Sequence, residues 1–334
     1  MNSIKKMMLS GALGCLISGM AYADGSSPQP VKPYWQDIQV VAVNKEKPRS
    51  SFMSYADRET ALTSRFEKSP YYSLLNGTWK FFFVDSYKDL PQNITDPSVN
   101  TSSWDDITVP GNWEVQGHGV AIYTNHGYEF KPKNPQPPLL PEANPVGVYR
   151  RDIEIPANWD NRDIYLHIGG AKSGLYVYLN GKEVGYSEDS KNPAEFLINK
   201  YLQPGKNVLT LKIFRWSTGS YLECQDFWRM SGIERDVFLW SQPKASIQDF
   251  RVVSTLDDTY TNGIFKLAVD LKNHTQETKN LNVGYELLDA KGNLMASEAN
   301  DIWVSPASPQ TASFEYDLKL SLIHISEPTR LALI

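Results

Sequence analysis

Cysteine is scarce in this sequence. Its 334 residues contain two cysteines, Cys15 and Cys224. Because Cys15 falls in a predicted leader that export would remove, the mature chain keeps Cys224 alone and cannot form an intramolecular disulfide. A nucleophilic Cys224 would need a histidine base nearby in space, and the sequence identifies none, so a half-buried structural thiol is favoured. An exported chain of this kind must be held together by core packing.

Long hydrophobic runs are also absent, apart from one near the N-terminus. Lys5 and Lys6 precede an apolar run over residues 7–20, and a small-x-small cleavage pattern ends at Ala23. The run is too short to span a bilayer comfortably, so we predict a signal peptide in residues 1–23. Apolar residues continue beyond the first cysteine, which makes a lipoprotein signal less favoured. We therefore expect an exported protein, periplasmic or extracellular, with no membrane span.

The charges do not favour a nucleic-acid partner. The formal net charge is −5 at pH 7, and there is no Lys/Arg tract that would follow a phosphate backbone. The sequence also lacks a phosphate loop, a dinucleotide fingerprint and a Ser-His-Asp signature, and its histidines lack metal-ligand spacing. From these residues alone we expect no cofactor in this chain.

A long amphipathic helix is missing too, and short strand patterns take its place. Strands are predicted at 75–83, 107–110, 148–155, 164–168, 175–179, 208–213 and 237–240. Asn180-Gly181 is the strongest hairpin signal among the connections. We predict an all-β fold in which a jelly-roll β-sandwich occupies residues 65–243, preceded by an extended, Pro-rich N-terminal arm at residues 24–64.

A second set of strands follows a boundary near Gln242-Pro243. Its members are predicted at 247–254, 264–271, 281–288 and 312–318, with a turn at 289–293. This spacing is typical of an immunoglobulin-like β-sandwich, here over residues 244–319. About five strands are recognisable where seven are usual, so we expect this domain to be incomplete.

Residues 320–334 do not fit either domain. The segment 320–330 reads LSLIHISEPTR, and its back-translation with ordinary codons resembles the transposon-end adapter of sequencing libraries. We interpret the tail as adapter read-through, in which case the natural protein continues past Lys319. The alternative is a genuine final strand with a short tail.

The segment 214–237, FRWSTGSYLECQDFWRMSGIERDV, is unusually polar and aromatic. Its flat apolar faces are Trp216, Tyr221, Phe227 and Trp228, and its directed polar groups are Arg215, Glu223, Asp226, Arg229 and Arg235. Such a mixture suits a sugar, which offers a C–H face for stacking and hydroxyls for hydrogen bonds. The alternative is a structural ion-pair cluster that fixes a long loop, since buried polar groups must be paired. Most of the segment is interpreted as structural, with Asp226 as the candidate ligand contact.

A second candidate is the loop that contains Asn125. The segment 111–128 leads into a Pro-rich run at 132–145, which cannot form a regular strand or helix. Long ordered loops of this kind are often functional. The Asn125 amide can both donate and accept, as sugar hydroxyls require. Its alternative role is to close a turn through its own backbone.

These motifs carry a family resemblance. LNGTW at 75–79, PGNW at 110–113, IYTN at 122–125, NPVG at 144–147 and the block at 215–237 occur in this order. They resemble the N-terminal part of β-galactosidases of glycoside hydrolase family 2 from about Tyr34 to Pro243, and more loosely beyond. The block WS-x-GSYLE-x-QD-x-WRMSGI-x-RDV is more similar to the large galactosidases than to the family's glucuronidases or mannosidases.

The resemblance implies a five-domain enzyme in which the first domain sends a loop into the active site of a TIM barrel. It implies that a substrate-contacting Asn falls on Asn125, and that a substrate-contacting Asp, also a sodium ligand, falls on Asp226. Thr218 and Cys224 depart from the residues of many relatives, but neither is one of these two sites.

The same resemblance places the chemistry outside this chain. Retaining hydrolysis uses an acid/base Glu and a nucleophilic Glu about 5 Å apart. In the family both lie on the barrel, as do most magnesium ligands, so magnesium and sodium are expected for the full enzyme only. This chain should contain no catalytic residue and be inactive alone. Glu223 and Asp226 lie in one loop and are not interpreted as a substitute pair.

The expected substrates are galactosides or galactose-containing glycans, and the expected protein partner is the enzyme's own barrel domain. Two other functions remain open. One is a stand-alone carbohydrate-binding module on an immunoglobulin-like stalk. The other is a structural or assembly domain of a homo-oligomer, in which the arm at 24–64 joins a subunit interface.

Overall fold

The computed structural model describes residues 32–130, 133–319 and 330–333. Contacts divide the chain into two units, Met1–Lys32 and Pro33–Ile334, and every element below belongs to the second. The predicted signal peptide, residues 1–23, lies outside the described residues. Among the described helices none is long and apolar enough to cross a membrane.

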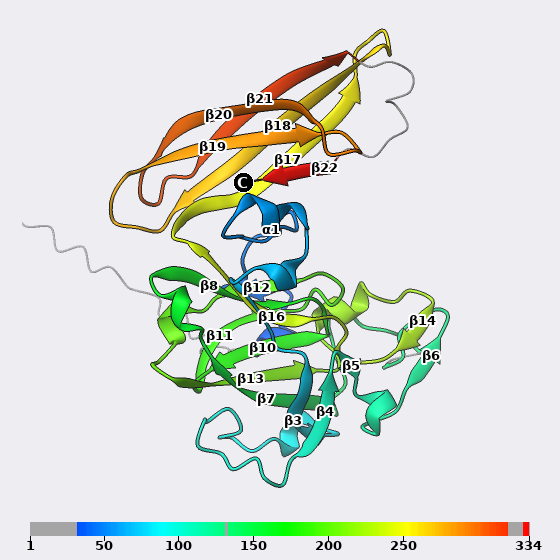
Figure 1. The fold of residues 1–334 in the computed structure, drawn as a ribbon. Coiled ribbons are helices and arrows are strands. Elements are labelled where there is room, and N and C mark those ends of the chain that lie inside the picture. Colours follow the sequence, from blue (N-terminus) through cyan, green and yellow to red (C-terminus); the bar gives the residue numbers. More distant parts are fainter. Residues whose placement is uncertain (1–31, 131–132, 320–329, 334) are drawn as a thin grey trace, which may run out of the picture. The chain divides into compact units, whose positions relative to one another are not determined.

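The described residues are almost entirely β, as predicted (Figure 1). The one α-helix among the described residues is α1 (Arg58–Leu62). The 3-10 helices are η1 (Tyr34–Gln36), η2 (Phe66–Lys68), η3 (Tyr87–Asp89), η4 (Glu114–Gln116), η5 (Ala157–Trp159), η6 (Asn199–Tyr201) and η7 (Thr218–Tyr221).

The first sandwich is the predicted jelly roll and contains two main antiparallel sheets. In spatial order, the seven-stranded sheet is β1 (Ala42–Val43), β11 (Lys182–Ser187), β10 (Gly174–Leu179), β13 (Lys206–Phe214), β7 (Val146–Glu154), β3 (Gly77–Val84) and β4 (Asp105–Val109). The four-stranded sheet is β12 (Ala194–Leu197), β8 (Arg162–Ile168), β16 (Val237–Pro243) and β2 (Tyr72–Leu74).

The core of this sandwich follows from the alternation of its strands. In β3, Trp79 and Phe81 are buried, while the residues on either side of Trp79 are more accessible. They join Leu211 of β13 with Leu166 and Leu239 of the other sheet in one buried cluster. Burying a large apolar side chain contributes roughly 1.5–3 kcal/mol. This cluster is drawn from both sheets and holds them together in a sandwich whose described residues contain no disulfide.

The predicted hairpin at Asn180-Gly181 is confirmed. The two residues have φ angles of 53° and 77° and join β10 to β11, with Leu179 paired to Lys182. Positive φ at both central positions is what a two-residue type I′ turn requires. Local turn chemistry therefore sets the register of this edge of the seven-stranded sheet.

The second sandwich is immunoglobulin-like and consists of two three-stranded sheets. One contains β17 (Ala245–Leu256), β18 (Asn262–Asn273) and β21 (Gln310–Lys319), and the other contains β20 (Leu294–Val304), β19 (Lys279–Leu288) and β22 (Arg330–Leu333). Its core is a separate cluster that includes Leu267, Val269, Tyr285 and Phe314. The four predicted strands all fall within longer observed ones. The interpretation of residues 320–334 as adapter read-through is not tested by the structure. Residues 320–329 lie outside the described part, and the pairing of β22 with β19 does not bear on the origin of the segment.

The N-terminal arm packs along its own chain where it is described. Trp35 is only 1% exposed and stacks on Phe214 with the ring centroids 5.0 Å apart. β1 then pairs with β11 at the edge of the seven-stranded sheet. Farther on, Ser50 donates from its backbone N–H to Asp249 Oδ1 at 2.8 Å and from its hydroxyl to the Phe250 carbonyl at 2.7 Å. This part of the arm is therefore anchored to its own chain.

Two smaller sheets complete the first sandwich. One is made by β5 (Gly111–Asn112), β15 (Gly232–Ile233) and β9 (Ala171–Lys172). The other is a two-stranded ribbon of β6 (Ile122–Thr124) and β14 (Phe227–Arg229), which lie side by side in Figure 1.

Candidate functional site

The ribbon of β6 and β14 brings together the two residues predicted to contact a ligand. The strands are antiparallel, with Thr124 paired to Phe227 and Tyr123 paired to Trp228. Asn125 follows the end of β6 and Asp226 precedes the start of β14. The next facing position of the register is therefore occupied by Asn125 and Asp226.

Strand alternation explains which side chains of the ribbon face solvent. Successive side chains of a strand point to opposite faces. Tyr123 and Trp228 are 56% and 55% exposed, and Asn125 and Asp226 are exposed as well. These four residues form the outer face of the ribbon, which we call the candidate site. The alternate residue Phe227 is half-buried on the inner face.

Within the candidate site, the aromatic rings and the Asp226 carboxylate are in contact. The Tyr123 hydroxyl donates to Asp226 Oδ1 at 2.8 Å, and this hydrogen bond raises the pKa of Tyr123. The Tyr123 and Trp228 rings have centroids 5.7 Å apart and are tilted to each other. The arrangement offers aromatic faces to solvent beside a carboxylate whose second oxygen makes no hydrogen bond with the described residues. These are the groups that bind the C–H face and the hydroxyls of a sugar.

Asn125 keeps donor capacity in this arrangement. Its Oδ1 lies 2.6 Å from Nδ1 of His126, whereas its amide nitrogen has no hydrogen-bond partner among the described residues. Among the described residues, no hydrogen bond joins the Asn125 side chain to the neighbouring backbone. The described contacts therefore do not contain the turn that the alternative predicts. Its NH2 group is available to a ligand hydroxyl.

Several residues of segment 214–237 proved to be structural. Trp216 and Tyr221 are 9% and 8% exposed, so their faces are not available for stacking. Arg215 is buried and donates from Nη2 to the Val120 carbonyl at 2.9 Å, while its Nη1 lies 3.5 Å from Glu114 Oε1. Burial raises the pKa of Glu114. These contacts match the ion-pair alternative of the sequence analysis for this part of the segment.

Glu223 and Cys224 are structural as well. Glu223 accepts from the backbone N–H of Ser190 at 2.9 Å and from its hydroxyl at 2.6 Å. The Cys224 thiol donates to the Ser220 carbonyl at 3.2 Å, and burial raises its pKa. A nucleophilic thiol needs a lowered pKa, so the environment of Cys224 agrees with a structural thiol.

The candidate site does not by itself contain a complete metal centre. No group of three His, Cys, Asp or Glu side chains capable of holding a metal is found in the part of the chain that is described. Sodium is a hard cation that prefers several oxygen ligands. Asp226 fits as one of them through its free oxygen, and the remaining ligands would have to come from elsewhere.

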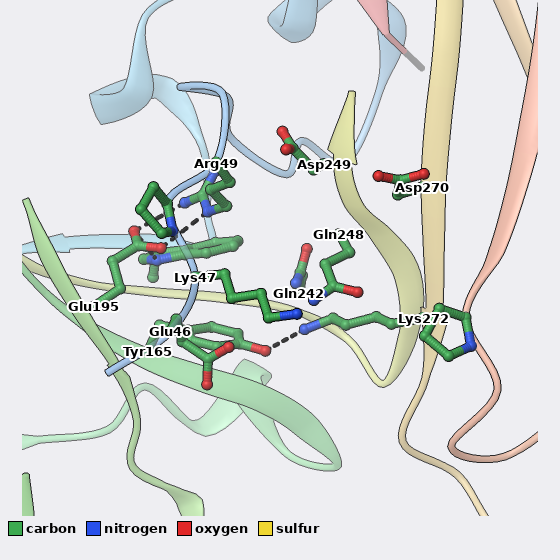
Figure 2. Close-up of a pocket in the computed structure, with 13 residues that line it drawn as sticks. Glu46, Lys47, Arg49, Tyr165, Glu195, Gln242, Gln248, Asp249, Asp270 and Lys272 are labelled. Carbon is green, nitrogen blue, oxygen red and sulfur yellow. Dashed lines mark hydrogen bonds and ion pairs between the residues drawn. The ribbon is translucent and has the colours of Figure 1, made fainter. Parts of the chain in front are cut away.

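Cavities of about 350, 360 and 400 Å³ lie beside the N-terminal arm, and none of the three is lined by Asn125 or Asp226. Figure 2 shows the first, between the arm and strands of both sandwiches. Arg49 Nε and Nη2 each donate at 2.9 Å to a different oxygen of Glu195. Lys272 contacts the Tyr165 hydroxyl and lies 3.4 Å from Asp163 Oδ2. These charged groups are already paired with one another. We therefore interpret them as contacts that hold the arm in place rather than as a sugar site.

Sequence reasoning missed Tyr123 as a member of the candidate site. Its motif, Ile122 to Asn125, drew attention to Asn125 alone. The available signal was the strand-like alternation of the motif, which places Tyr123 and Asn125 on one face. The contact with Asp226 depends on the pairing of β6 with β14. Neither segment alone predicts that pairing.

Comparisons with known proteins show which proteins this chain resembles. The profile described as "Glycosyl hydrolases family 2, sugar binding domain" matches residues 72–243. A β-galactosidase of Priestia megaterium is 37% identical over 291 residues, which cover 86% of this chain and 28% of that protein. A β-galactosidase of Psychromonas ingrahamii is 36% identical over 257 residues, covering 77% and 24%. The chain thus spans about a quarter of the length of these curated relatives.

Solved structures share the fold at lower identity. A β-glucuronidase of Bacteroides uniformis superimposes with a TM-score of 0.60 and 20% identity, covering 74% of this chain and 28% of that one. A member of the same hydrolase family from Bacteroides cellulosilyticus gives a TM-score of 0.58 and 16% identity, covering 78% and 33%. These likenesses establish the architecture.

Proposed function

Because the chain belongs to glycoside hydrolase family 2, as its N-terminal sugar-binding domain, we propose that it is the first part of a retaining β-galactosidase. The observation that carries this proposal is the β6–β14 ribbon, which presents Asn125 and Asp226 together on an exposed face beside Tyr123 and Trp228. The substrates are β-galactosides or galactose-containing glycans. Similarity to β-galactosidases over most of the chain supports this choice.

The chain contributes binding rather than bond cleavage. Asp226 accepts from sugar hydroxyls through its free oxygen, and the Asn125 amide nitrogen donates to them. Retaining hydrolysis needs two carboxyl groups about 5 Å apart, which we assign to a barrel domain that follows this chain in the full protein. Magnesium and sodium belong to that complete active site, with Asp226 supplying one sodium ligand.

The charge of the candidate site favours a galactoside over a glucuronide. A glucuronide carries a carboxylate, which the exposed Asp226 would repel, whereas a galactoside is neutral. The solved glucuronidases resemble this chain only at the level of the fold, at 20% identity. We also propose that the protein is exported, because a signal-peptide pattern precedes the sugar-binding domain.

The test is the complete gene product assayed with nitrophenyl β-galactoside and β-glucuronide. We expect the galactoside to be the better substrate. We expect Asp226→Asn to lower kcat/KM for it by at least about tenfold, because a hydrogen bond to a charged group contributes about 1.5–3 kcal/mol. The melting temperature should change little, since Asp226 is exposed. A preference for the glucuronide, or an unchanged kcat/KM, would contradict the proposal.

A second function is a stand-alone carbohydrate-binding module, and the exposed Tyr123–Trp228 pair favours it. Titration calorimetry of this chain with galactose tests it, with Trp228→Ala as the control variant. Without a barrel to complete the pocket, the enzyme proposal expects weak binding. A micromolar Kd that Trp228→Ala abolishes would favour the module.

A further inference from the structure

One buried guanidinium contacts both chain segments that carry the candidate site. Arg229 of β14 is 1% exposed. Its Nη2 donates to the Thr124 carbonyl at 3.4 Å, directly before Asn125, and its Nη1 donates to the Glu223 carbonyl at 3.2 Å, three residues before Asp226. The same side chain thus spans the β6 segment and the loop that leads into β14.

The inner face of the ribbon holds this guanidinium in place. Its carbon lies 4.9 Å from the Phe227 ring centroid, as alternation along β14 predicts for residues two apart. Its Nε lies 3.9 Å from Glu129 Oε2, on the segment that leaves Asn125. The other oxygen of Glu129 accepts from Trp216 Nε1 at 3.0 Å. The side chains of Arg229 and Glu129 are 1% and 5% exposed, so solvent screens this pair little.

We propose that Arg229 is a positioning residue that fixes the separation and orientation of Asn125 and Asp226. The proposal rests on the proposed function of the ribbon as a galactoside contact. Arg229 itself does not reach the outer face, so it acts only through the main-chain carbonyls it binds and through its pairing with Glu129. A planar guanidinium can bind two carbonyls in fixed directions, whereas a lysine ammonium is a single point charge.

The chain provides a matched control for this role. Arg150 of β7 is also buried, at 5% exposure, and also donates to main-chain carbonyls, at 2.8 Å to Ile94 and 2.9 Å to Asp96. It stacks over an aromatic ring in the same way, 5.2 Å from that of Trp104. Its carbonyl partners belong to a loop that contributes nothing to the candidate site. Loss of Arg150 therefore reports the structural cost of removing such a residue without a change in ligand positioning.

The experiment compares Arg229→Lys and Arg150→Lys in the complete gene product, each alone and combined with Asp226→Asn. We expect both lysine variants to lower the melting temperature. Arg229→Lys alone should lower kcat/KM for nitrophenyl β-galactoside by at least about tenfold, since a small misplacement of binding groups is costly. In the double variant with Asp226→Asn, the loss of kcat/KM should be smaller than the product of the two single losses, because both substitutions act on the same contact. Arg150→Lys should leave kcat/KM within about twofold and combine multiplicatively. Glu129→Gln, an isosteric change, serves if Arg229→Lys does not fold.

The outcomes separate this inference from the proposed function. If Asp226→Asn lowers kcat/KM but neither Arg229→Lys nor Glu129→Gln does, the positioning role is wrong and the galactoside contact stands. Equal kinetic losses in Arg150→Lys and Arg229→Lys also overturn it, since stability alone would explain them. If Asp226→Asn has no effect, the proposed function fails, and the positioning role fails with it.

Discussion

Glu195 is the residue at which the arm meets the four-stranded sheet. It accepts two hydrogen bonds from Arg49, lies 2.8 Å from Nδ1 of His167 and accepts from Trp240 Nε1 at 3.1 Å. The Arg49 guanidinium also lies 4.4 Å from the Trp240 ring centroid. Burial raises the pKa of Glu195, but the hydrogen bonds from His167 and Arg49 outweigh it and hold this pKa below its ordinary value. The carboxylate is therefore more stable in the folded chain than in the unfolded one.

Replacing Glu195 with Gln should destabilise the protein at pH 7. The loss of the charge leaves the half-buried Arg49 without its partner, and breaking an ion pair costs up to about 3–5 kcal/mol when it is fully buried. Urea unfolding measures the change. Glu315→Gln is the control, because its pair with Lys266, at 2.8 Å, is exposed and contributes less than about 1 kcal/mol. Equal effects of the two substitutions would contradict the role of Glu195.

The same carboxylate predicts a pH dependence. Because the folded pKa of Glu195 is lowered, its contribution to stability is present above the unfolded value, near 4.3. It is lost as the pH falls through the folded pKa. The difference in unfolding free energy between the original chain and Glu195→Gln should therefore shrink as the pH falls below about 4.3. A difference that grows as the pH falls below that value would be inconsistent with a lowered pKa.

At the scale of elements, the turns differ in how much space surrounds them. Gly181 and Gly205 have nearly the same φ, 77° and 76°. A Cβ on Gly181 would lie 2.9 Å from the Pro97 Cδ, whereas a Cβ on Gly205 would have nothing within 4 Å. The β10–β11 hairpin thus combines a left-handed turn with close packing against a loop that is distant in sequence.

Alanine at these two glycines separates backbone strain from packing. Gly205→Ala should cost about 1–2 kcal/mol, the price of a left-handed conformation for a residue with a Cβ. Gly181→Ala should lower the free energy of unfolding by more, because Pro97 must also move away from the new Cβ. Denaturant unfolding of both variants measures the difference. A smaller cost at Gly181 than at Gly205 would mean that the turn packs less closely than described.

Element prediction missed several strands, among them β11 and β12 of the first sandwich and β20 of the second. β20 was not recognised from the sequence, although the turn at 289–293 before it was. It is an edge strand beside β19, and most of its residues are exposed. Exposed edge strands carry polar residues without a hydrophobic alternation, so the periodicity signal is lost.

At the scale of the whole molecule, a buried polar cluster links strands of the two sandwiches. Lys272 of β18 is 6% exposed, contacts the Tyr165 hydroxyl of β8 and lies 3.4 Å from Asp163 Oδ2. Gln242, with its amide oxygen turned toward the ammonium, accepts from Lys272 Nζ at 2.8 Å. His274 Nδ1 lies 2.7 Å from the same oxygen of Asp163. Each sandwich otherwise has its own apolar core.

Removing this ammonium should uncouple the unfolding of the two cores. We expect a single thermal transition in the original chain and two in Lys272→Met, with the immunoglobulin-like sandwich unfolding first because its core is smaller. Asp163 would be left buried with less compensation for its charge. Calorimetry measures the transitions. Lys266→Met, on the same strand but exposed, should keep a single transition, and two transitions in both variants would contradict a specific role for Lys272.

The sequence by itself determined the all-β class, the two successive sandwiches, the Asn-Gly hairpin and the family, because alternation, turn chemistry and motif order are local properties of the chain. It also singled out Asn125 and Asp226, first as polar groups suited to sugar hydroxyls and then through the family resemblance, but with no signal that connects the two. Only the tertiary structure decided that they are neighbours, that Tyr123 contacts Asp226, and that Arg229 lies beneath them. It also showed that the described arm is bound in cis. Each of these depends on contacts between segments far apart in the chain, which neither segment specifies until both sheets have packed around a common core.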